Sequence, residues 1–122
     1  VLERNSSLDF LKPSGVIVNM EMSVPVIESI FHKNAPLHDG AVIIENNTIT
    51  ATRVVLPVSE NKSIPKRYGL RHRAAVGITE KTDAVVLVVS EETGTISYFR
   101  NGERVPFGAY KELSELLTKD MD

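Results

Sequence analysis

Three short polar clusters carry residues that could do chemistry: "LHDGA" at 37–41, "RHR" at 71–73 and "SEETG" at 90–94. In the first, His38 and Asp39 offer nitrogen and oxygen ligands for a divalent metal ion, and Gly40 lets a ligand approach the backbone. An aspartate before a glycine is also a common turn residue, and a single histidine is often packed or solvated. The first cluster therefore predicts a metal site or an ordinary turn.

The second cluster stands at the start of an expected helix. There Arg71 and Arg73 bring two guanidinium groups near the positive end of the helix dipole, a combination suited to phosphate oxygens. The alternative is a solvated helix start whose arginines form salt bridges. In the third cluster, Glu91 and Glu92 follow an apolar run, either as further metal ligands or as polar turn residues.

Taken together, the clusters favour metal-assisted phosphoryl or nucleotidyl transfer. That chemistry needs a carboxylate for the cation, cationic groups for the leaving phosphates and a positioned attacking oxygen. The sequence contains no P-loop, dinucleotide-binding fingerprint, G-x-S-x-G serine motif or H-E-x-x-H zinc motif. Nucleotide chemistry at a metal site is thus the favoured hypothesis. The least specific alternative is an interaction domain without a ligand.

Composition excludes several classes of binding partner. The 122 residues fit one domain, and a formal net charge of -2 with a pI near 5.9 gives no basic field for a nucleic acid. The absence of cysteine excludes disulfides and thiolate sites and agrees with the cytoplasm. No apolar run approaches the ~20 residues that span a bilayer, so we expect no direct membrane contact from this segment. Because the chain opens at Val1 with "VLER", we expect a missing upstream segment.

Helical spacing appears twice in the first third of the chain. Residues 6–15 predict a short helix with Ser6 or Ser7 as N-cap, which ends between Pro13 and Gly15. Residues 23–34 predict a helix of about three turns. Its N-cap is Ser23, its first turn contains Pro25, and its apolar face comprises Ile27, Ile30 and Phe31.

Strand patterns follow. Residues 41–45 and 48–55 are rich in β-branched side chains and predict a hairpin, because Asn46 and Asn47 tolerate the left-handed geometry of a tight turn. Residues 57–67 are polar with two prolines and predict a surface loop.

The second half alternates helix and strand patterns. Residues 70–82 predict a helix with Ala74, Ala75 and Ile78 at helical intervals, and "DAVVLVVS" at 83–90 predicts a central strand covered on both faces. A second hairpin, "TISYFR" and "ERVPF", turns at "NG". The last helix presents one face of Tyr110, Leu113, Leu116 and Leu117. These elements predict an α/β fold, a single domain with a central twisted mixed β-sheet flanked by helices.

Read in order, "PLHDGAVII", "LPVS", "RHRAAVGITEKTDAVVLVVSEETGTIS" and the following "NG" closely resemble the diadenylate cyclase (DAC) domain, also called DisA_N. The resemblance runs from about Ser23 to Gly102, with weaker similarity at both ends. It implies a DAC catalytic domain over residues 1–122, truncated at its N-terminus, that condenses two ATP molecules into cyclic di-AMP and releases two pyrophosphates with Mg²⁺ or Mn²⁺. Full-length members often carry membrane spans, so the resemblance also implies a parent protein that can be anchored in a membrane.

The resemblance assigns roles to individual residues. In its DGA motif, the aspartate binds metal and activates the attacking 3′-hydroxyl group, while its RHR motif contacts the ATP phosphates. The implied catalytic residues are Asp39, Gly40, Ala41, Arg71, His72 and Arg73. The implied ATP-binding residues are Gly40, Val55, Leu56, Pro57, Leu70, Arg71, Ser90 and Glu91. The implied metal ligands are His38, Asp39 and Glu92.

One position departs from the family pattern. Members usually read Gly-Thr-Arg-His-Arg, whereas this chain has Leu70 after Gly69, so an alkyl group replaces a hydroxyl expected near the phosphates. A hydrogen bond to a charged group is worth about 1.5 to 3 kcal/mol, which predicts weakened nucleotide handling. An ATP-binding regulatory module with decayed catalysis is therefore the alternative function.

The reaction also makes a demand on assembly. Each 3′-hydroxyl group must attack the α-phosphate of the other ATP, but the chain holds one set of motifs. We therefore expect a homodimer in which two facing subunits each bind one ATP.

Overall fold

Two tight turns built on asparagine join strands of this protein. In the computed structural model, which describes residues 1–32, 35, 39–90 and 93–122, Asn46 and Asn47 have φ angles of 46° and 64°, and Asn101 and Gly102 have φ angles of 52° and 78°. Paired positive φ angles match the twist of a two-residue hairpin. Both predicted hairpins are confirmed.

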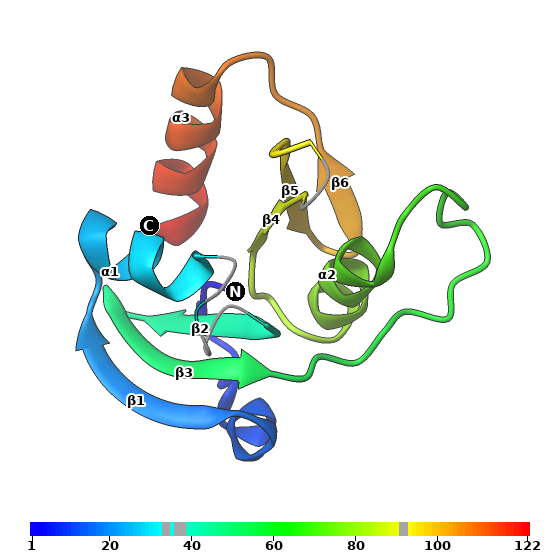
Figure 1. Ribbon diagram of the computed structural model, residues 1–122. Helices are drawn as coiled ribbons and strands as arrows, with labels where there is room; N and C mark the ends of the chain where they lie inside the picture. The colour runs from blue at the N-terminus through cyan, green and yellow to red at the C-terminus, as the bar shows by residue number, and fades with distance from the viewer. Residues whose placement is uncertain (33–34, 36–38, 91–92) are drawn as a thin grey trace. The chain divides into compact units, whose positions relative to one another are not determined.

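The contacts of the chain gather in two units, Val1–Pro57 and Val58–Asp122. The first unit holds an antiparallel sheet in the order β1-β3-β2, so that β3 lies in the middle (Figure 1). Its strands are β1 (Val16–Glu21), β2 (Ala41–Glu45) and β3 (Thr48–Val54). A parallel bridge between Leu2 and Ile44 adds the start of the chain beside β2.

The helices of the first unit are shorter than the sequence predicts. Helix α1 spans Val24–Phe31, with Ser23 as the predicted N-cap, whose hydroxyl accepts from the Val26 N–H at 3.3 Å. Its eight residues make just over two turns, where about three were predicted. The 3₁₀ helix η1 spans Asp9–Ser14, and its N-cap is Leu8 rather than the predicted Ser6 or Ser7, although the Ser7 hydroxyl accepts from the Asp9 N–H at 3.2 Å.

Apolar residues from α1 and the sheet form the core of the first unit. Ile30 of α1 is buried with Val42 of β2 and Ile49 of β3, so the helix covers one face of the sheet. Phe31, predicted on the same face, remains 48% exposed. Leu8, directly before η1, and Leu11 within it are buried, and this helix contacts β1 and β3.

The second unit combines a three-stranded antiparallel sheet with two helices. Its sheet order is β4-β5-β6, with β4 (Val86–Val89), β5 (Ile96–Arg100) and β6 (Glu103–Val105). Helix α2 spans Leu70–Lys81, as predicted, and contacts all three strands. Helix α3 spans Tyr110–Met121.

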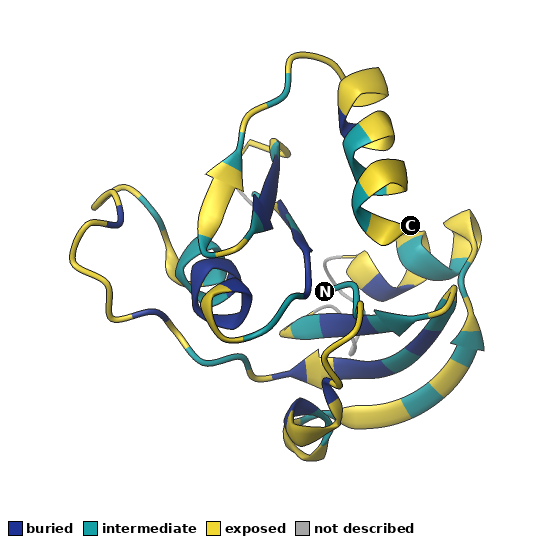
Figure 2. Ribbon diagram, turned by 180° about the vertical axis from the view of Figure 1, so that it is seen from behind, coloured by how far each residue is buried: buried dark blue, intermediate teal, exposed yellow. Residues whose placement is uncertain are grey.

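Burial in the second unit centres on β5 and on residues 75–79 of α2 (Figure 2). Tyr98 and Phe99 are fully buried, and the Tyr98 hydroxyl donates to Asp120 of α3 at 2.6 Å. The predicted burial of residues 83–90 is confirmed from Ala84 to Val86, but Val89 is 50% exposed. Within this unit the middle strand of the sheet is β5, whereas the sequence predicted a central strand at 83–90. On α3, Leu113 is buried whereas Tyr110 is 66% exposed, so Tyr110 does not belong to the buried face.

Residues 57–67 form no helix or strand, as predicted, but they are tied to α2. The Ser59 hydroxyl donates to Glu80 at 2.6 Å, and the Ser59 N–H donates to the Arg73 carbonyl at 3.1 Å. The α/β fold class is confirmed, with antiparallel sheets flanked by helices. Within the described part of the chain, no helix combines the length and apolar character needed to cross a bilayer.

Candidate functional site

The turn that leads into β2 is fixed by backbone packing. Gly40 has a φ of +93°, and a Cβ atom on it would lie 2.8 Å from both the Cα and the carbonyl carbon of Arg53. A side chain would therefore meet both an unfavourable backbone conformation and an immovable neighbour. Asp39, directly before this glycine, is exposed and has no hydrogen bond or ion pair to any residue that the structure describes.

The end of β3 lies behind this turn. Arg53 has a φ of +54°, which is uncommon for a residue with a side chain, and the register between β2 and β3 shifts between Ala41 and Ile43. Such irregularities re-aim the residues around them and gather near functional sites. Beyond them, Val55 is 70% exposed and its N–H donates to the Ser14 hydroxyl at 2.9 Å, while Leu56 and Pro57 are half-buried.

The first turn of α2 begins at a glycine. Gly69 is its N-cap and carries no side chain to accept from the leading N–H groups, and its carbonyl accepts from the Arg73 N–H at 3.1 Å. Leading N–H groups of a helix have no acceptor within the helix, so they suit an anion. Leu70, the first residue of this turn, is 75% exposed.

Two anchors hold the arginines of this turn. The Arg71 Nη1 group donates to the Val89 carbonyl at 3.3 Å, which joins the start of α2 to the end of β4. The Arg73 Nε group donates to the Tyr68 carbonyl at 3.1 Å. Among the described residues, nothing accepts from the terminal nitrogens of Arg73, so these donors remain available to a ligand.

His72 lies among aromatic rings. Its ring centroid is 5.4 Å from that of Tyr68, with a 33° tilt, and 6.1 Å from that of Phe99, in an edge contact. Burial lowers the pKa of His72, and the positive charges of Arg104 and Arg71 lower it further. The imidazole is therefore predominantly neutral at neutral pH.

The turn after β4 is organised by Ser90. Its N–H donates to the Thr95 carbonyl at 3.0 Å, its carbonyl accepts from the Gly94 N–H at 2.9 Å, and its hydroxyl accepts from the Thr93 N–H at 3.3 Å. The predicted Glu91 and Glu92 lie outside the described residues, as does His38.

Each unit thus gathers part of the predicted site. The first unit brings Asp39, Gly40 and Ala41 beside the end of β3, before Val55. The second joins the start of α2, with its four predicted residues at 70–73, to the strand end before Ser90. Sequence reasoning missed Ser14, which accepts from the Val55 N–H 41 positions away, and Tyr68, whose carbonyl accepts from Arg73 and whose ring contacts Phe99. The first half offers a carboxylate to a cation or hydroxyl group, and the second offers positive charge and N–H donors to phosphate.

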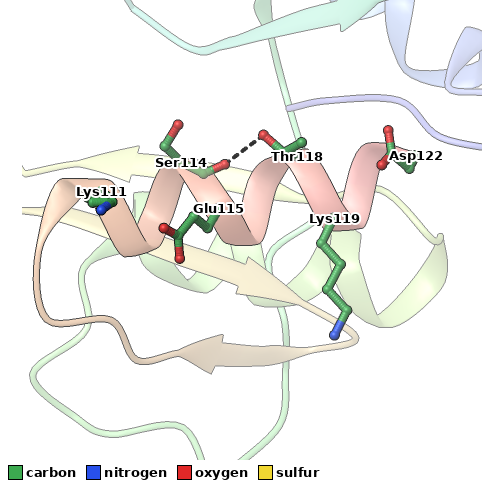
Figure 3. A pocket seen from close by; sticks show the side chains of 6 residues that line it. All are labelled: Lys111, Ser114, Glu115, Thr118, Lys119 and Asp122. Carbon is green, nitrogen blue, oxygen red and sulfur yellow. Dashed lines mark hydrogen bonds between the residues drawn. The ribbon is translucent and has the colours of Figure 1, made fainter.

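Two other features lie apart from the predicted residues. Glu3, Asp9 and Glu45 gather their carboxylates within 4.8 Å of one another, but Lys12 contacts Asp9 at 2.8 Å and Glu45 at 2.9 Å, so this cluster carries its own cation. A shallow hollow runs along one exposed side of α3 (Figure 3). It is lined by Lys111, Ser114, Glu115, Thr118, Lys119 and Asp122 and includes no predicted site residue.

Curated proteins are similar to this chain in sequence. Diadenylate cyclase CdaS of Bacillus thuringiensis is 46% identical over 102 residues, covering 84% of this chain and 51% of that protein. Cyclic di-AMP synthase CdaA of Bacillus subtilis is 43% identical over 120 residues, covering 98% of this chain and 42% of that protein. The chain thus spans about half the length, or less, of these curated relatives.

Solved structures agree. The crystal structure of a DacA double mutant from Staphylococcus aureus matches with a TM-score of 0.93 and 38% identity, over 98% of this chain and 80% of that one. A hypothetical membrane spanning protein from Bacillus cereus matches with a TM-score of 0.84 and 42% identity, over 88% of this chain and 53% of that one. The family model for DisA bacterial checkpoint controller nucleotide-binding (DAC) matches residues 1–104, over most of the chain, and the protein therefore belongs to the DAC family.

Proposed function

We propose that this chain is the catalytic unit of a diadenylate cyclase, which condenses two ATP molecules into cyclic di-AMP and releases two pyrophosphates. The observation that carries the proposal is the family match over residues 1–104, which includes all three polar clusters. Relatives that are 43 and 46% identical are named as enzymes of this activity.

In this proposal, Asp39 serves the attacking nucleotide. Its exposed carboxylate, which has no partner among the described residues, can hold a divalent cation or polarise a 3′-hydroxyl group, and Gly40 fixes the turn beside it against the Arg53 backbone. Mg²⁺ or Mn²⁺ fits this oxygen donor and would neutralise charge on the phosphates when bound. His38 and Glu92 are proposed as the further ligands.

The adenine base is assigned to residues 55–57. The exposed Val55 side chain can pack against a flat base. Because the Val55 N–H already donates to Ser14, polar contacts to the base fall to its carbonyl and to the backbone of Leu56.

The triphosphate is assigned to the second unit. Arg71 and Arg73 supply charge, the first turn of α2 supplies N–H donors, and the turn at Ser90 lies after the strand end that Arg71 contacts. Catalysis then comes from alignment and charge neutralisation, with pyrophosphate as the leaving group.

Each chain completes half of the reaction. The two new phosphodiester bonds require two 3′-hydroxyl groups and two α-phosphates, whereas one chain carries a single set of motifs. We therefore propose a C₂ homodimer with one ATP per facing subunit. We also propose that it acts in the cytoplasm; the description of the Bacillus cereus neighbour as membrane spanning supports a membrane-anchored parent.

A second candidate is an ATP-binding regulatory module with weakened catalysis. Leu70 favours it, because its exposed alkyl side chain stands at the start of α2, where family members usually carry a hydroxyl group. The two candidates differ in turnover rather than in binding.

Incubation of the chain with ATP and Mn²⁺, over a range of protein concentrations, tests the proposal. Cyclic di-AMP should form, at a rate per chain that rises with concentration as dimers assemble, and Asp39→Asn should abolish turnover while the thermal melt stays unchanged. No product from folded wild-type chain at high concentration would contradict it. If ATP binds without turnover and Leu70→Thr restores none, the regulatory module is favoured.

A further inference from the structure

The loop before α2 contributes a residue that the motifs do not include. Tyr68 is half-buried, and its ring contacts three side chains at once. The centroid lies 5.4 Å from His72 and 6.1 Å from Phe99, which it meets edge-on at 82°, and the Arg67 guanidinium carbon lies 5.5 Å from it. Phe99 is fully buried in β5, so this cluster fixes Tyr68 to the core of the second unit.

The backbone of the same residue holds Arg73. Its carbonyl accepts from Arg73 Nε at 3.1 Å, one turn into α2. A guanidinium group is rigid and planar, so fixing Nε sets the plane in which its terminal N–H groups point. Tyr68 therefore contacts the first turn of α2 in two ways, through its ring and through its carbonyl.

We propose that Tyr68 is a positioning residue for phosphate binding: its ring packs on His72 and Phe99, and its carbonyl thereby holds the Arg73 guanidinium toward the nucleotide. In this arrangement His72 acts through the aromatic cluster, and the phosphates are contacted by its two arginine neighbours. The inference rests on the proposed function, because it takes ATP as the ligand of Arg73.

A purely structural role makes a different prediction. If the cluster only stabilised the fold, removing the ring would lower the melting temperature but leave the affinity of the remaining folded protein for ATP unchanged. A positioning role predicts a loss of affinity at temperatures where the variant is fully folded. It also predicts rescue by a ring of the same shape, since packing rather than a hydroxyl or nitrogen atom is required.

The experiment compares Tyr68→Ala with Tyr68→Phe, and His72→Ala with His72→Phe. Tyr110→Ala is the matched control, because Tyr110 is exposed on α3 and belongs to no proposed contact. ATP dissociation constants come from calorimetry with Mn²⁺, and KM and kcat come from the cyclase assay. The Arg73 Nε–H resonance, followed by ¹H–¹⁵N NMR, reports the hydrogen bond to Tyr68 directly.

We expect Tyr68→Ala and His72→Ala to weaken ATP binding about tenfold or more, mainly through KM, and to accelerate exchange of the Arg73 Nε–H proton. Each phenylalanine variant should lose clearly less than its alanine partner, and Tyr110→Ala should match the wild type. Should Tyr68→Ala fail to fold, Tyr68→Leu takes its place.

Unchanged ATP affinity in folded Tyr68→Ala would overturn the inference. Equal losses in His72→Phe and His72→Ala would also overturn it, since the imidazole nitrogens would then be the groups that matter. A wild-type chain that binds ATP but makes no cyclic di-AMP contradicts the proposed function and leaves this comparison standing. Failure of the wild type to bind ATP would overturn both.

Discussion

The turn at Asp39–Ala41 and the first turn of α2 are held by different means. At the first, backbone meets backbone: Gly40 with a positive φ lies against Arg53, which also has a positive φ. At the second, side chains and loop carbonyls hold two arginines. A site fixed by backbone contact tolerates no added atom, whereas a site fixed by side-chain packing tolerates replacements of similar shape.

The largest expected effect comes from adding one methyl group at Gly40, in the turn at Asp39–Ala41. Gly40→Ala forces a side chain into a left-handed conformation and against the Arg53 backbone. Left-handed geometry costs about 1 to 2 kcal/mol and overpacking a similar amount, so we expect the free energy of unfolding to fall by about 3 kcal/mol. Denaturant unfolding measures the loss, and cyclase activity should disappear with it.

Two other glycines separate the cost of the left-handed conformation from the cost of overpacking. Gly94 has a φ of +72° and open space around it, so Gly94→Ala should cost about 1 kcal/mol from conformation alone. Gly69 has an ordinary φ of -79° and open space, so Gly69→Ala should change stability by less than about 0.5 kcal/mol. If Gly40→Ala costs no more than Gly94→Ala, the backbone contact with Arg53 does not fix this turn.

A smaller effect is expected where the loop meets α2. Ser59 is buried, with 8% of its surface exposed, and its hydroxyl donates to the Glu80 carboxylate at 2.6 Å. Ser59→Ala removes this hydrogen bond. We expect a loss of about 1.5 kcal/mol in the free energy of unfolding. Ser63→Ala is the control in the same loop, because its bond to Asn61 is exposed, and it should stay within about 0.5 kcal/mol of wild type. Equal losses in the two variants would contradict a tie between loop and helix.

The smallest effect concerns protonation of His72. Its pKa lies below the ordinary 6.5 because of burial and the charges of Arg104 and Arg71. Between the lowered pKa and 6.5 the folded chain binds fewer protons than the unfolded chain, so His72 contributes a loss of stability as the pH falls through that window. NMR titration should show the lowered pKa, and Arg104→Gln should raise it. A pKa of 6.5 or above in the wild type would contradict this environment.

Local patterns predicted most elements of the fold. The two asparagine turns, α2 and the Ser23 cap follow from residues that are neighbours in sequence. Strand β1 was assigned to no element, and the face of Tyr110 was wrong, because burial on an edge strand or a terminal helix depends on what the rest of the chain covers. Helix α1 ends at Phe31, before the end at residue 34 that the sequence predicted.

For the site, the sequence identified candidate functional residues but not the residues that hold them in place. Asp39, Arg71 and Arg73 were recognised from charge and spacing. Their neighbours were not recognised, because the Val55 contact with Ser14 spans 41 positions and the Tyr68 ring contacts Phe99 on the distant strand β5. Tertiary packing decides such contacts, and no local pattern encodes them.

The proposed function requires that the Asp39 carboxylate and the α2 arginines serve one nucleotide. A double-mutant cycle tests it most directly, with ATP affinity measured by calorimetry in Mn²⁺ for the wild type, Asp39→Asn, Arg73→Lys and the double variant. Distant sites without a shared partner give additive losses within about 0.5 kcal/mol, whereas groups in one network couple.

The account predicts a coupling energy of about 1 kcal/mol that disappears when Mn²⁺ is withheld, because the cation and triphosphate link the two groups. Additive losses in Mn²⁺, with all four proteins folded and the wild type binding ATP, would contradict it.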